Sequence, residues 1–285
     1  MAQRIFTTIT MSGNMDALIT MLSYPFMQRA LIAGLLLGLL LASLGVLATL
    51  RKMAFFGEGI AHASLAGIAL GIFSGISPLP VAIVWAILIA ATIYWLERST
   101  KLSSDTLIGI LFTTSMALGV IIMSQTAGYQ PELISFLFGS ILTIRPDDLL
   151  IIAFFTVIIL SWFLVSLKQL TYISLNEDAA RVTGLKTKTQ TLLLYITLAI
   201  ATVLGVKILG IILVSALLVL PAASGRLLSS SFKTYVWASL LISESVIVSG
   251  LTLSYFYDLP SGATIVLVGA GIFFLITMTQ RLTKN

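Results

Sequence analysis

The chain has 285 residues, of which 58% are hydrophobic and only 9% are charged, and its net charge is +5. The mean hydropathy of +1.09 excludes an ordinary soluble globular protein, because so few charged side chains could not cover a water-exposed surface. The sequence contains no cysteine, which excludes disulfides and thiolate metal sites. The basic residues fall in short segments between apolar runs, so the positive charge does not indicate nucleic-acid binding.

Nine apolar stretches are long enough to cross a bilayer as helices, since about 20 residues span its hydrocarbon core. They cover residues 28–50, 54–74, 79–96, 105–125, 147–167, 189–206, 208–227, 234–256 and 261–280. These runs are continuous, whereas the strands of a membrane β-barrel alternate in polarity over about ten residues. The sequence therefore predicts an all-α, polytopic membrane protein with about nine transmembrane helices; eight to ten are compatible with the pattern.

Two segments do not fit the spanning pattern. Residues 1–23 are mixed in polarity, show no cleavable signal peptide and are predicted to form an N-terminal segment before a single transmembrane domain at 24–282. Residues 132–144 are too short to span and lie between Pro131 and Pro146, which favours a half-helix or a re-entrant segment.

Lysine and arginine residues follow alternate apolar stretches. They are Arg51, Lys52, Arg98, Lys101, Lys168, Arg181, Lys186, Lys188, Arg226, Lys233, Arg281 and Lys284. The loops on the other side, 75–79, 126–131 and 257–260, carry neither residue type. Because cytoplasmic loops are enriched in Lys and Arg, the N-terminus is predicted outside and the C-terminus in the cytoplasm. Arg145 and Lys207 break this pattern, and their polar ends are expected to reach a headgroup region.

An acidic and a basic side chain lie four residues apart in the second apolar stretch, at Glu58 and His62, and His62 is the only histidine of the chain. An ionisable residue at membrane depth costs about 2.5–3.5 kcal/mol on insertion scales, so such residues mark functional sites. Residues four apart share one helix face, and carboxylate with imidazole suits Zn²⁺, Mn²⁺ or Fe²⁺. The pattern predicts a transient metal site in a pore. The alternative is that Glu58 and His62 form a hydrogen bond with each other within the helix, and that the pair packs against neighbouring helices.

Two ligands are too few for zinc, which usually takes four. Other helices, backbone carbonyls or a second copy of the chain must therefore complete the metal shell. An incomplete shell suits permeation, because an ion that is held too well does not leave. Gly57, Gly59 and Gly67 flank the pair and are expected to let neighbouring helices approach closely.

Two further intramembrane positions are candidate pore residues. Glu244 lies in the middle of an apolar stretch between Ser243 and Ser245, and a pore carboxylate and a satisfied structural carboxyl are equally compatible with this pattern. Ser215 precedes Pro221 in a run of small and apolar residues. The preferred interpretation of that run is a packing kink at the proline.

The longest predicted cytoplasmic loop covers residues 168–190. Within it, Ser174 to Glu177 resembles a capping box that starts a short helix through Asp178 and Ala179, and Gly184 is a plausible stop. The short helix is either a solvated connector or a docking element for a cytoplasmic partner. The chain has no G-x-x-x-x-G-K-[ST] loop and no H-E-x-x-H motif, so it is predicted to be non-catalytic and not to hydrolyse ATP by that route.

Several segments together resemble the membrane permeases of manganese, zinc and iron ABC importers, the ABC-3 family. The segment of residues 57–67 resembles the second-helix motif of that family, and the resemblance extends over residues 30 to 280. The other matching segments, in the order of the family, are 137–140, 176–180, Gly184, 215–223 and 257–262. The acidic position is commonly aspartate in the family, whereas this chain has Glu58.

The resemblance implies a permease homodimer in a prokaryotic inner or plasma membrane, with two cytoplasmic ATPase subunits and an extracytoplasmic metal-binding protein. It implies that the loop containing Glu177, Asp178, Ala179 and Gly184 is the coupling helix that docks on the ATPase. The cargo would be Zn²⁺, with Mn²⁺ and Fe²⁺ also compatible, and the ion would cross by alternating access without being a permanent cofactor. The rival functions are a gradient-driven metal transporter, with Glu244 and Glu58 as a relay, and an intramembrane enzyme.

Overall fold

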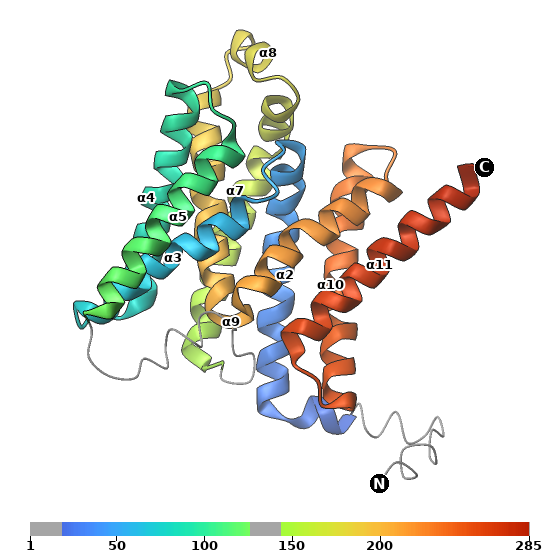
Figure 1. Ribbon diagram of the computed structural model, residues 1–285. Helices are drawn as coiled ribbons and strands as arrows, with labels where there is room; N and C mark the ends of the chain where they lie inside the picture. Colours follow the sequence, from blue (N-terminus) through green and yellow to red (C-terminus); the bar gives the residue numbers. More distant parts are fainter. Residues whose placement is uncertain (1–18, 126–143, 285) are drawn as a thin grey trace.

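The computed structural model describes residues 19–125 and 144–284, and all regular elements in these ranges are helices (Figure 1). The elements are α2 (Pro25–Leu50), α3 (Phe56–Phe73), α4 (Pro78–Ser99), α5 (Ser104–Ser124), α7 (Pro146–Leu175), α8 (Glu177–Val182), α9 (Thr187–Leu228), α10 (Phe232–Tyr257) and α11 (Ser261–Lys284). Within the described ranges, eight of these helices are long and apolar enough to cross a membrane. The prediction of an all-α polytopic membrane protein is confirmed.

Helix α9 contains two of the nine predicted spans. A straight helix of its 42 residues would be about 63 Å long, roughly twice the hydrocarbon thickness of a bilayer. The helix breaks at Gly210, where φ is 78° and ψ is 165°. The chain then turns back, so that Gly205 lies against the side chain of Val214 (Figure 1). The two halves of α9 therefore correspond to the separate spans predicted at 189–206 and 208–227.

The two halves of α9 and helix α2 form the centre of the bundle. Helix α9 packs against α2, α3, α4, α7, α10 and α11. On α2, residues Leu37, Leu40, Leu41 and Leu44 are fully buried, as expected of a helix that is apolar on all sides and surrounded by other helices. Figure 1 shows α3, α4 and α5 on one side of this centre and α10 and α11 on the other.

The connections alternate between the two ends of the bundle. In Figure 1 the α2–α3, α4–α5 and α9–α10 connections lie at the upper end with α8 and the C-terminal end of α11. The α3–α4 and α10–α11 connections and the bend of α9 lie at the lower end. The connections rich in Lys and Arg thus gather at one end, which is the arrangement that the sequence predicts for the cytoplasmic side.

Lys207 has a specific partner near the opposite end. Its Nζ lies 2.5 Å from Oδ1 of Asp148, in the first turn of α7, and the Asp148 side chain is only 13% exposed. Lys207 is therefore held by an ion pair within the bundle. The expectation from the sequence that it reaches a headgroup region is wrong. Arg145, in contrast, is 78% exposed and lies 4.0 Å from Asp147. The predicted re-entrant segment 132–144 lies, apart from its last residue, outside the described residues, as does most of the predicted N-terminal segment 1–23.

Candidate functional site

Helix α3 is inserted closely between its neighbours, and its glycines are the reason. A Cβ atom on Gly57 would meet the Leu218 side chain of α9, and one on Gly59 would meet Ile108 of α5. A Cβ atom on Gly67 would lie 2.7 Å from the backbone of Ala82 on α4. The prediction that these glycines allow close helix approach is confirmed. The close packing fixes the helix that carries Glu58 and His62.

Glu58 and His62 lie one helical turn apart near the start of α3. Glu58 is exposed on the surface of the single chain, and His62 is half-buried. The carboxylate is close enough to interact electrostatically with the imidazole, but in the described part of the chain no hydrogen bond joins them. The imidazole lies 5.2 Å from the ring of Phe112 on α5, centroid to centroid. This arrangement does not support the alternative of an intrahelical hydrogen bond.

The imidazole keeps a nitrogen free for a ligand. Nδ1 of His62 is buried and has no hydrogen-bond partner among the described residues. A buried polar atom without a partner is costly, and a functional role is one explanation. Within residues 19–125 and 144–284, no group of three or more His, Asp and Glu side chains could hold a metal ion. The pair therefore offers one oxygen ligand and one nitrogen ligand, which is an incomplete shell for Zn²⁺.

Glu244 lies away from this pair. Its helix, α10, packs on α2, α9 and α11, whereas α3 packs on α4, α5 and α9. The Oε1 atom of Glu244 is buried without a hydrogen-bond partner in the described chain, and it faces Gly38 on α2. The neighbouring Ser243 donates to the carbonyl of Gly38 at 3.1 Å. The fold thus does not bring Glu244 together with Glu58, as a relay between them would require.

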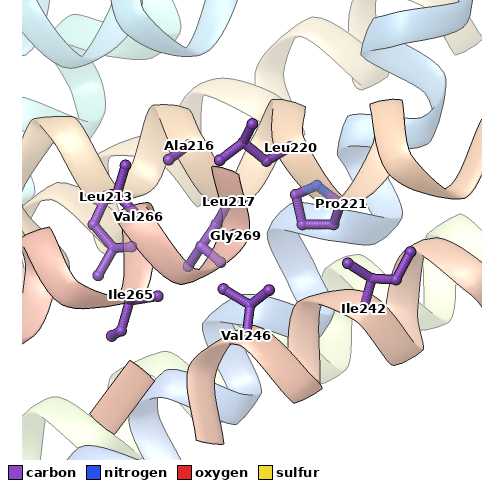
Figure 2. A pocket seen from close by; sticks show the side chains of 10 residues that line it. All are labelled: Leu213, Ala216, Leu217, Leu220, Pro221, Ile242, Val246, Ile265, Val266 and Gly269. Carbon is purple, nitrogen blue, oxygen red and sulfur yellow. The ribbon is translucent and has the colours of Figure 1, made fainter. Parts of the chain in front are cut away.

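Ser215 lies in the second half of α9, and its hydroxyl is also buried without a partner among the described residues. Pro221 follows within the same half, but the backbone departs from helical angles at Gly210 and not at the proline. A small cavity lies beside Pro221, between α9, α10 and α11 (Figure 2). It is lined by Leu213, Ala216, Leu217, Leu220, Pro221, Ile242, Val246, Ile265, Val266 and Gly269. An entirely apolar lining offers no metal ligand.

The short helix α8 begins two residues later than the sequence predicts, with its N-cap at Asn176 and not at Ser174. Ser174 belongs to α7, and the N-cap of α8 is Asn176, whose side chain accepts a hydrogen bond from the backbone of Ala179 at 3.0 Å. The predicted capping box from Ser174 is therefore wrong, because α7 continues through Leu175 and the asparagine side chain caps the new helix. The stop at Gly184 is confirmed, since this residue has the left-handed φ of 80° that favours glycine.

The acidic residues of α8 point in different directions. Asp178 and Ala179 are exposed, whereas Glu177 turns toward the bundle and is 28% exposed. The Glu177 carboxylate lies 3.6 Å from Arg51 and 2.5 Å from Arg98. In the sequence, Arg51 and Arg98 indicate only the orientation of the chain in the membrane. Each arginine follows a different apolar stretch, and no local sequence pattern predicts that both contact the carboxylate of Glu177.

Comparison with known proteins agrees with this fold. Residues 23–280 match the model of the ABC 3 transport family. The chain is 34% identical to the high-affinity zinc uptake system membrane protein ZnuB of Haemophilus influenzae, over 88% of this chain and 97% of ZnuB. It is 33% identical to the manganese import system permease protein ScaB of Streptococcus gordonii, over 92% of this chain and 95% of ScaB.

The fold also matches a solved structure, that of PsaBC from Streptococcus pneumoniae in complex with Fab. The TM-score is 0.81 at 31% identity, and the match covers 92% of this chain and 95% of that chain. The family model, the related sequences and the solved structure each cover most of the chain. The chain belongs to the ABC 3 transport family.

Proposed function

We propose that the chain is the permease subunit of an ATP-binding-cassette importer that moves a divalent transition metal, preferably Zn²⁺, into the cytoplasm. The observation that carries this proposal is the pair Glu58 and His62 in a membrane-spanning helix. One is exposed, the other half-buried, and neither has a hydrogen-bond or ion-pair partner outside the pair among the described residues. A carboxylate and an imidazole in this state are ligands for Zn²⁺, Mn²⁺ or Fe²⁺.

A second copy of the chain would complete the site. An exposed carboxylate facing lipid costs several kcal/mol, about 2.5–3.5 on insertion scales, so Glu58 needs another protein surface or an aqueous path. Two copies of the pair would supply two carboxylates and two imidazoles, which matches the four ligands that zinc prefers. The same four groups also suit Mn²⁺. The zinc and manganese systems named among the relatives support the class of cargo rather than one metal.

The proposed transporter has two further kinds of subunit. The chain lacks a nucleotide-binding loop, so a separate cytoplasmic ATPase dimer would supply the energy and an extracytoplasmic binding protein would deliver the ion. Helix α8 is the proposed coupling helix, with Asp178, Ala179 and residues 181–184 presented to the ATPase. Their exposure at the end of the bundle rich in Lys and Arg supports this role. That end lies in the cytoplasm of a prokaryotic cell in this proposal, with the N-terminus outside.

Transport would proceed by alternating access. The ion loses part of its hydration shell to Glu58 and His62, and ATP binding and hydrolysis in the partner subunit change which side of the membrane the pair faces. Because the shell remains partly open, the ion can leave again.

The test is uptake of radioactive zinc and manganese into proteoliposomes that contain the permease with its copurified ATPase and binding protein. We expect ATP-dependent uptake by the unchanged chain. His62→Ala should reduce uptake at limiting metal by about 100-fold or more, because loss of even an outer-shell partner costs about 10–100-fold in metal affinity. The ATPase should copurify with the variant as before. Normal uptake by His62→Ala would remove the site assignment, and ATP-independent uptake by the unchanged chain would remove the importer.

A further inference from the structure

We propose that Glu177 is a positioning residue, which transmits movement of α8 to the metal-binding helix α3 through Arg51. This inference rests on the proposed function, and it assigns to Glu177 a role other than docking on the ATPase. The residue is the first of α8, yet its side chain is directed back to the membrane helices.

The Glu177 carboxylate joins three elements of the fold. Its Oε2 lies 3.6 Å from Arg51, the residue that ends α2, and its Oε1 lies 2.5 Å from Arg98 in the last turn of α4. The same Oε1 lies 3.3 Å from Arg181 of α8 itself. Arg51 also donates to the hydroxyl of Thr191 on α9 at 3.2 Å. Movement of α8 therefore reaches the ends of α2 and α4 through the Glu177 side chain, and it reaches α9 through Arg51.

The burial of this cluster distinguishes it from ordinary surface ion pairs. The side chains of Arg51, Arg98 and Glu177 are 13%, 26% and 28% exposed. The Arg98 guanidinium also lies 4.7 Å from the centre of the Tyr94 ring. Glu177 accepts a charge-assisted hydrogen bond from Arg98 and forms an ion pair with Arg51 at 3.6 Å. Such contacts between partly buried charges are stronger and better oriented than exposed pairs. The cluster can therefore act as a mechanical link between α8 and the bundle.

The connection from Arg51 to α3 is a fixed turn. The backbone N–H of Met53 donates to the carbonyl of Ala48 at 2.8 Å, and Lys52 between them has a left-handed φ of 59°. These are features of a Schellman-type helix end. Met53 is buried, and its carbonyl accepts the N–H of Phe56, the first residue of α3, at 3.1 Å. A displacement of Arg51 is thus passed to the start of α3, two residues before Glu58.

The experiment uses the complete transporter in proteoliposomes and compares Glu177→Gln with Asp105→Asn. Asp105 is an exposed carboxylate in the first turn of α5, at the same end of the bundle, with no ion pair in the described residues. For Glu177→Gln we expect a decrease of about tenfold in the kcat of metal-stimulated ATP hydrolysis and of transport, the size of a lost charge-assisted bond. The KM for the metal and the amount of copurified ATPase should not change. Asp105→Asn should have the same kcat, the same KM and the same amount of copurified ATPase as the unchanged chain.

A second variant separates transmission from a general structural defect. Arg51→Gln should lower kcat to a similar extent, and the double variant should be no slower than the single variants, since both remove the same link. An unchanged kcat in Glu177→Gln, a loss of the ATPase subunit, a raised KM or additive effects would overturn the inference alone. Absence of ATP-dependent uptake by the unchanged chain would overturn the proposed function and the inference with it.

Discussion

At the scale of single residues, the site depends on what surrounds Glu58 and His62. Gly57 and Gly59 remove side chains on the faces that contact α9 and α5, so the helix lies close to both. The imidazole is then half-buried beside Phe112 while the carboxylate stays exposed. The two candidate ligands of one chain thus lie in different environments. The buried nitrogen is shielded from water, and the exposed oxygen can meet a second copy.

Glu58 should be replaceable only by another carboxylate. In Glu58→Asp the charge remains but the side chain is shorter by one methylene, so we expect uptake to persist with an altered ratio of zinc to manganese. In Glu58→Gln the anionic ligand is lost, and uptake at limiting metal should fall by about 10–100-fold or more. Competition between the two radioactive metals in proteoliposomes measures both effects. Equal uptake by Glu58→Asp and Glu58→Gln would show that the carboxylate at this position does not bind the metal.

At the scale of elements, the bend of α9 has the greatest consequence for the fold. Without the break, the 42 residues could not remain within one bilayer thickness. The backbone at Gly210 has a φ of 78°, which L-residues with a side chain adopt at a cost. The turn places Val214 against Gly205 and returns the second half of α9 to α2 and α3. The helix that contains Ser215 is positioned by this single glycine.

Gly210→Ala should destabilise the protein. At Gly210 φ is 78° and ψ is 165°, a combination that is essentially restricted to glycine. A Cβ atom there costs about 1–3 kcal/mol, so the midpoint of thermal unfolding in detergent should fall. Gly109→Ala is the matched control, because a Cβ atom there would meet no heavy atom within 4 Å and the residue lies inside α5. An alanine in an exposed helix interior should leave the midpoint unchanged or raise it. Equal decreases in the two variants would contradict the role given to Gly210.

At the scale of the whole molecule, the two ends of the bundle differ in charge. The end with α8 holds the connections rich in Lys and Arg and the cluster around Glu177. Near the other end, the described part of the chain places an ion pair between Lys207 and Asp148. Lys207 does not contradict the orientation, since its charge is already compensated. The charge distribution therefore supports one orientation for the whole bundle.

The orientation can be measured with single cysteines, because the chain has none of its own. Ser77→Cys lies in the α3–α4 connection and Ser230→Cys in the α9–α10 connection, and both positions are exposed. A membrane-impermeant maleimide added to intact cells should label the first and not the second. After permeabilisation both should react. Labelling of Ser230→Cys in intact cells would reverse the proposed orientation.

The membrane class, the resemblance to a family and most helix boundaries follow from the sequence alone, although α7 continues to Leu175 where the sequence predicts an end at 167. These depend on the local run of apolar residues and on glycine or proline at the ends, so the boundary of α3 was predicted within two residues. The sequence also identified Glu58 and His62, since ionisable residues in an apolar stretch stand out from their neighbours. It placed the break between the two halves of α9 within a few residues of Gly210.

Contacts between residues that are far apart in the chain follow only from the way the helices pack. Glu177 and Arg51 are separated by more than a hundred positions, and no local pattern relates them, yet packing of α8 on the bundle makes them an ion pair. The same holds for Lys207 and Asp148, and for the separation of Glu244 from Glu58. Periodicity and hydropathy act over one or two helical turns, whereas the order in which helices surround α2 and α9 follows from the sum of side-chain contacts between them.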